Sequence, residues 1–96
     1  MNLILDLYLD NKKEELTGLI MTKINHTMFN LKMNTTMLKT RSLLFDFGIY
    51  INKLNSVVNL LLFNSDNKNL IVKKLNEIVD FEKKLLATDY YIYELN

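Results

Sequence analysis

The sequence predicts an all-α fold, a three-helix antiparallel bundle with one long central helix, and two observations lead to it. The 96-residue chain has no proline and only two glycines, whereas folds with many tight turns use more of both. Apolar residues also recur at helical spacing over most of the chain. We expect one helical domain over residues 1–96, because a chain of this length supports a single core.

The central helix is predicted over residues 37–63, where two interleaved series each recur every seven positions. The series are Met37, Leu44, Ile51 and Val58, and Thr40, Phe47, Leu54 and Leu61, widened by Leu43, Tyr50 and Val57. Such a helix extends about 40 Å at 1.5 Å per residue, more than a small bundle covers. We therefore expect part of this seam, which resembles that of a coiled coil, to mediate homo-oligomer formation. Gly48, inside it, is interpreted as a close approach by a neighbouring helix, with a kink as the alternative.

A helix is also expected before the central one. Asn11 and Glu14 match a capping box, so this helix is predicted to begin at Lys12. Its apolar stripe then recurs at helical spacing as Leu16, Ile20, Ile24, Met28 and Leu31. A short N-terminal segment is expected to pack on the bundle.

The last helix follows the clearest break in the chain, the four polar turn-forming residues 64–67. Ser65 or Asp66 is predicted to cap it, and it is expected to run from Asp66 to at least Thr88. Its buried stripe is predicted to contain Ile71, Leu75, Ile78, Leu85 and Ile92.

An α+β fold with a short N-terminal strand is the alternative. Leu5, Leu7 and Leu9 alternate with polar residues, a pattern typical of strands, and residues 29–33 alternate in the same way. An N-terminal strand would pair with residues 91–93. The sequence therefore leaves open whether residues 2–33 are helical or partly strand.

No motif for catalysis, metal binding or cofactor binding is found. The chain has no cysteine, which excludes thiolate ligands and nucleophiles. The single histidine, His26, has no ligand cluster around it and is interpreted as a surface or boundary residue. There is no glycine-rich phosphate loop and no apolar run long enough to cross a bilayer. We expect no enzyme activity, no cofactor, no membrane partner and a cytoplasmic location.

The candidate partner-binding residues lie in the last helix and beyond it. Three tyrosines in four positions cannot all face one core, and tyrosine is enriched in binding hot spots. Two nearby acids, Glu82 and Asp89, fall on or beside the predicted buried stripe. They are expected to reach water at its edge, or alternatively to make a polar contact to Arg41 or a lysine, or to anchor a partner. The candidates are Phe81, Glu82, Asp89, Tyr90, Tyr91 and Tyr93.

The predicted function is a non-enzymatic protein–protein interaction module that docks on a larger protein. Lysine outnumbers arginine eleven to one and asparagine occurs thirteen times, a bias typical of AT-rich genomes. We therefore expect an inhibitor (anti-defence) protein or adaptor encoded by a phage or another mobile element, such as a plasmid. The alternative is a nucleic-acid-binding accessory factor, although the net charge is only +1 and we expect no nucleic-acid partner. That alternative requires one basic face made of Lys12, Lys13, Lys32, Lys39, Arg41 and Lys53.

Overall fold

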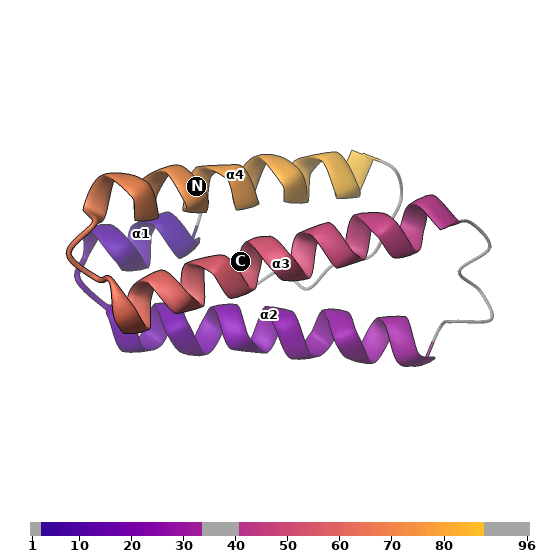
Figure 1. Cartoon of the computed structure of the whole chain (residues 1–96), viewed down its shortest axis with the longest axis horizontal. Helices are drawn as coiled ribbons and strands as arrows, with labels where there is room; N and C mark the ends of the chain where they lie inside the picture. The colour runs from indigo at the N-terminus through magenta and orange to yellow at the C-terminus, as the bar shows by residue number, and fades with distance from the viewer. Residues whose placement is uncertain (1–2, 34–40, 88–96) are drawn as a thin grey trace.

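The computed structural model describes residues 3–33 and 41–87, with side chains described for residues 3–29 and 45–85. Four α-helices and no strand occupy these ranges (Figure 1). They are α1 (Leu3–Leu9), α2 (Lys13–Met33), α3 (Arg41–Phe63) and α4 (Lys68–Ala87). The predicted all-α class is confirmed. The predicted three-helix bundle is wrong, because the N-terminal segment forms a helix of its own.

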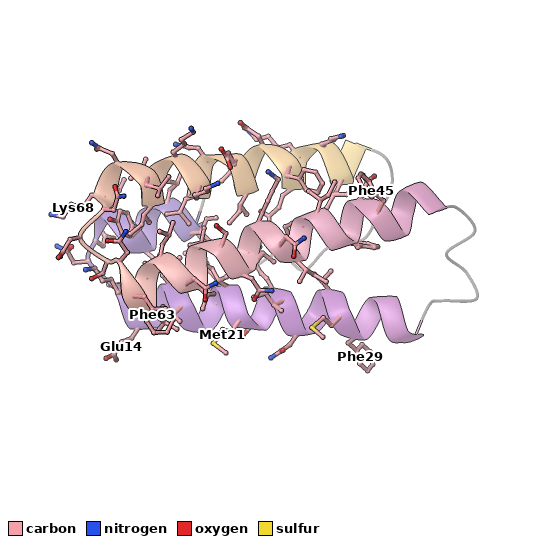
Figure 2. All side chains as sticks on the ribbon, in the orientation of Figure 1. Glu14, Met21, Phe29, Phe45, Phe63 and Lys68 are labelled. Atoms are coloured by element: carbon pink, nitrogen blue, oxygen red, sulfur yellow. The ribbon has the colours of Figure 1, made fainter. Side chains whose placement is uncertain are left out.

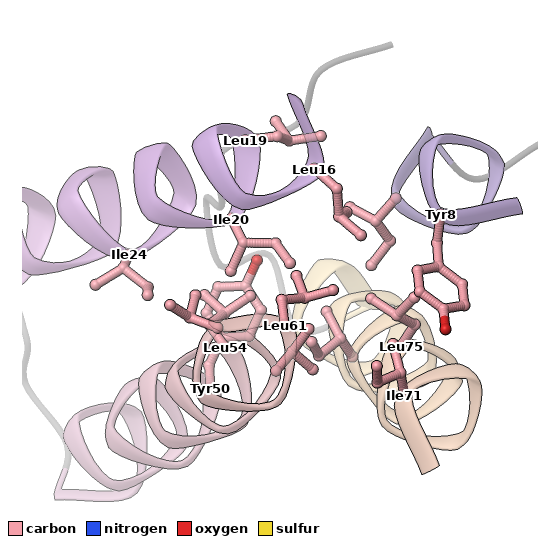
Figure 3. Close-up of a cluster of buried hydrophobic side chains, with 14 of the residues drawn as sticks. Tyr8, Leu16, Leu19, Ile20, Ile24, Tyr50, Leu54, Leu61, Ile71 and Leu75 are labelled. Atoms are coloured by element: carbon pink, nitrogen blue, oxygen red, sulfur yellow. The ribbon is translucent and has the colours of Figure 1, made fainter. Parts of the chain in front are cut away.

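The four helices surround one apolar core. α2 packs against α1 and α3, and α4 packs against α3 and α1. The helices therefore form a ring in the order of the chain, with α2 and α4 on opposite corners (Figure 3). All four contribute fully or almost fully buried side chains, among them Ile4, Leu16, Leu54 and Leu75.

α1 shows why the strand alternative is wrong. Ile4 and Tyr8 are four residues apart and both are buried, as expected for one face of a helix. Leu5 and Leu7 are partly buried and also pack on the core. A short helix that is apolar on most of its sides therefore imitates the alternation of a strand. The second strand-like segment, residues 29–33, lies within α2.

Asn11 builds the turn between α1 and α2, in a different role from the predicted one. Its φ of 60° lies in the left-handed region, which Asn tolerates better than most residues. The N–H of Asn11 donates to the carbonyl of Tyr8 at 3.1 Å, and the N–H of Lys12 donates to the carbonyl of Leu7 at 2.9 Å. These two bonds form a Schellman motif, which ends α1. The predicted capping box with Glu14 is wrong, because an N-cap residue takes an extended backbone.

α3 is a long helix, as predicted, although residues 37–40 of the predicted span lie outside the described residues. Its buried face is rotated from the predicted seam. Tyr50, Leu54 and Val57 are fully buried, whereas Ile51, from the first heptad series, is only half-buried. Two residues that were expected to widen the stripe, Tyr50 and Val57, are thus at its centre.

Gly48 does not mark a close contact between helices. A Cβ atom placed on it would meet nothing within 4 Å, and its φ is not positive. The predicted close approach by a neighbouring helix is therefore wrong. Neither space nor backbone conformation requires glycine at this position.

α4 is capped by Asn67 and not by the predicted Ser65 or Asp66. The N–H of Leu70 donates to Oδ1 of Asn67 in a long bond of 3.4 Å. The N–H of Ile71 donates to the backbone carbonyl of Asn67 at 3.1 Å. This is the pattern of an N-cap residue, and α4 begins at the next residue, Lys68. Its stripe is buried as predicted at Ile71, Leu75, Ile78 and Leu85, and the fifth predicted member, Ile92, lies outside the described residues.

Candidate interaction surface

The predicted partner-binding residues divide between two parts of the chain. Asp89, Tyr90, Tyr91 and Tyr93 lie outside the described residues, so their role stays a prediction. Phe81 and Glu82 lie in α4. Both belong to a polar and aromatic cluster that α2, α3 and α4 build together.

Glu82 is buried, with 7% of its surface exposed, so the expectation that it reaches water is wrong. Its Oε2 atom accepts a hydrogen bond from Nζ of Lys23 at 2.8 Å and another from the hydroxyl of Tyr50. Lys23, on α2, is itself 4% exposed, so the two charges form a buried ion pair. The pair joins two helices at opposite corners of the ring. A polar contact to a lysine was the alternative interpretation of Glu82.

The buried polar atoms of this cluster all have hydrogen-bond partners. Burying a charge is unfavourable unless an opposite charge and hydrogen bonds compensate. Among the described residues, every buried side-chain nitrogen and oxygen atom has a hydrogen-bond partner. Thr27, one turn after Lys23, donates its hydroxyl to the Lys23 carbonyl at 2.8 Å. The polar atoms of the cluster are therefore committed to one another inside the bundle, which points to a structural role.

Phe81 packs beside this cluster. Its ring stacks on that of Tyr50, with centroids 6.2 Å apart and 13° between the planes. The Nζ atoms of Lys53 and Lys84 lie 5.7 Å and 5.6 Å from its centroid, which is within the range of cation–π attraction. A partner that used Phe81 as an anchor would compete with these contacts.

Exposed apolar side chains gather on α2 and α3. Those at least half exposed are Met21 (50%), Met28 (54%) and Phe29 (58%) of α2, and Phe45 (68%), Leu62 (60%) and Phe63 (82%) of α3. Met21 and Met28 are seven residues apart and so lie on the same side of α2. Figure 2 shows Met21, Phe29 and Phe63 along one long edge of the molecule, over these two helices. Phe45, also exposed, lies near the opposite end of α3 from Phe63.

The middle of this surface carries no charge, and the exposed acid Glu14 of α2 lies near the same end of the molecule as Phe63 (Figure 2). The α2/α3 face is defined here as the exposed residues between positions 18 and 29 and between positions 52 and 63. They are Gly18, Met21, Thr22, Asn25, Met28, Phe29, Asn52, Asn55, Asn59, Leu62 and Phe63. By contrast, five of the seven exposed residues in the described part of α4 are charged. Depletion of charge together with Met and aromatic residues is typical of the centre of a protein interface.

Sequence reasoning missed this face because it assigned Met28 to the core. The predicted stripe advances from Leu16 in steps of four residues, and each step turns about 40° beyond a full helical turn. After three steps Met28 points about 120° away from Leu16. Lys23 and Thr27 occupy the core face instead, with exposures of 4% and 2%. Adding up these angles would have placed Met21 and Met28 together on the outside.

The residues considered for metal or nucleic-acid binding are described only in part, because the side chains of Lys32, Lys39 and Arg41 lie outside the described residues. No group of three His, Cys, Asp or Glu side chains among them is placed to hold a metal ion, and His26 is half-buried on α2. The ammonium group of Lys53 lies 4.0 Å from the carboxylate of Glu77 on α4, whereas Lys12 and Lys13 lie where α2 begins. These three lysines therefore do not gather on one basic face. Within the described ranges, no helix has the length and apolarity needed to cross a bilayer.

The described part of the chain is thus an all-α bundle with a buried ion pair and an uncharged outer face. The chain matches no protein-family model, and no curated protein or solved structure is significantly similar to it.

Proposed function

We propose that this protein is a non-enzymatic interaction module that docks on a larger protein through the α2/α3 face. The observation that carries the proposal is this face, with five large apolar side chains at least half exposed and no charge among its residues. Large exposed apolar side chains gathered on one side of a small protein are typical of an interaction site. Methionine adapts its shape to a partner, and phenylalanine contributes a large buried area.

The composition of the face favours a protein partner over other macromolecules. A nucleic acid requires cations placed against its phosphates, and a helix that lies on a membrane combines an apolar side with a Lys- and Arg-rich one. On the α2/α3 face the polar positions are instead held mainly by asparagines, namely Asn25, Asn52, Asn55 and Asn59. Uncharged amides beside Met and Phe suit a protein surface with few charges.

The concrete form that we propose is an inhibitor or adaptor encoded by a phage or plasmid. The excess of lysine over arginine and the thirteen asparagines support such a source. A chain of 11.4 kDa can act by covering a surface of its target, which requires no catalytic group. The commitment of Lys23 and Glu82 to each other is consistent with this mode of action.

Affinity capture tests the proposal. A tagged copy is expressed in the native host and its co-purifying proteins are identified by mass spectrometry, beside Phe29→Lys on the face and Asn76→Lys on the exposed side of α4. We expect a larger protein to be enriched with the wild type and with Asn76→Lys, and at least tenfold less with Phe29→Lys. Equal recovery by both variants, or no enrichment over a tag-only control, would contradict the proposal.

A further inference from the structure

We propose that in the free protein the α2/α3 face is covered by the same face of a second copy, in a two-fold symmetric dimer. The inference deepens the proposed function, because it rests on the same face and names its first partner. In such a dimer the same patch of both copies forms the interface. α2 and α3 of one copy would then pack against α2 and α3 of the other.

The area of the face matches what a dimer needs. Its five large apolar residues expose roughly 600 Å², taking about 200 Å² for each whole side chain. The adjoining asparagines and Gly18 raise this to the order of 800 Å² per copy, which is the contribution of one partner to a standard-size interface. Contacts of this size with few charged pairs give dissociation constants over a wide range, and we expect a micromolar one here.

The chemistry of the face is complementary to itself. A row of lysines or glutamates would repel its own copy, whereas the exposed residues of this face carry no charge. The amide of asparagine offers two donors and an acceptor, so Asn25, Asn52, Asn55 and Asn59 can bond to the same residues of a second copy. A second copy brings the same uncharged residues to the interface by identity, so no charge of either copy is buried without a partner there.

Gly18 adds a place for close packing. It is exposed at one end of the face, and nothing lies within 4 Å of where its Cβ atom would be. Because glycine has no side chain, the backbone of a neighbouring helix can approach α2 closely at this point.

The mass of the purified protein in solution tests the inference. Sedimentation equilibrium is run between about 1 µM and 500 µM, a range that spans the expected micromolar dissociation constant. The variants are Met28→Lys and Phe63→Lys on the face, with Asn76→Lys on α4 as a control that adds the same charge. Both face variants change side chains that are more than half exposed, and circular dichroism establishes that each is folded. If one variant fails to fold, the other still decides.

We expect the mass of the wild type and of Asn76→Lys to rise from 11.4 kDa toward twice that value, with at least a tenfold weaker dimer for each face variant. A wild type that stays monomeric at 500 µM overturns the inference, and so does a dimer that both face variants leave unchanged. A monomer that still captures a larger protein would leave the proposed function standing. A dimer from which no larger protein is captured would support this inference and contradict the proposed function.

Discussion

Replacing Glu82 by methionine is the perturbation that bears most directly on the core. The change keeps a side chain of similar length but removes the carboxylate that accepts hydrogen bonds from Lys23 and Tyr50. Lys23 is only 4% exposed, so its ammonium would stay in the interior without this counter-charge. Breaking one side of a buried ion pair costs about 3–5 kcal/mol.

That cost is a large part of the total stability. A chain of this length is expected to have a free energy of unfolding of about 5–14 kcal/mol. Glu82→Met should therefore lower the free energy of unfolding by about 3–5 kcal/mol, and the melting temperature by about 12 °C or more. Lys23→Met should cost a similar amount, because it leaves the carboxylate buried without the lysine.

The triple variant Lys23→Met, Tyr50→Phe and Glu82→Met separates the charge from the packing. It removes the whole polar cluster and fills its place with apolar groups, which is often neutral or stabilising by about 1–4 kcal/mol. We expect its free energy of unfolding to equal or exceed that of the wild type. Urea unfolding followed by circular dichroism measures the free energy of unfolding of all variants. The control is Asp80→Asn, which changes an exposed acid on the same helix and should alter the free energy of unfolding by no more than about 0.5 kcal/mol. A loss below 1 kcal/mol for Glu82→Met would refute the reasoning.

Two further predictions concern backbone positions. Gly48→Ala should raise the free energy of unfolding by about 1 kcal/mol, because a Cβ atom there meets nothing within 4 Å; a destabilised variant in thermal melts would show that the helix needs glycine. Asn11→Gly should be neutral or slightly stabilising, whereas Asn11→Val should cost about 1–2 kcal/mol, because the φ of 60° suits glycine and opposes a β-branched side chain. The same melts measure both, and equal stability of the two variants would contradict the Schellman motif.

Local patterns predicted α2, α3 and α4 well, because each combines a helical apolar stripe with polar residues at its ends. The stripe Ile71, Leu75, Ile78 and Leu85 was predicted and is buried. The same patterns failed for α1. This helix has only seven residues and is apolar on most of its sides, so its apolar residues show no helical period. The patterns also placed a cap at Asn11, because a capping pattern does not reveal a left-handed backbone.

The buried polar cluster depends on contacts between residues far apart in the sequence, which no local pattern reveals. Lys23 and Glu82 are 59 positions apart, and they meet only because α2 and α4 occupy opposite corners of the ring. The position of Glu82 on or beside the predicted stripe suggested a polar contact to a lysine, but no local pattern distinguishes Lys23 from the other lysines of the chain. The α2/α3 face was hidden for a related reason, since it is formed by two helices whose relative rotation follows from the packing of the whole bundle.

The central claim is that this protein binds through the α2/α3 face, and site-specific photo-crosslinking in cells tests it most directly. Benzoylphenylalanine is introduced in place of Phe63, which is 82% exposed, and in place of Asn76 on α4. We expect irradiation to yield a crosslinked product of higher mass, with a second copy or with a larger protein, from position 63 and none from position 76. No product from position 63, or equal products from both positions, would contradict the claim.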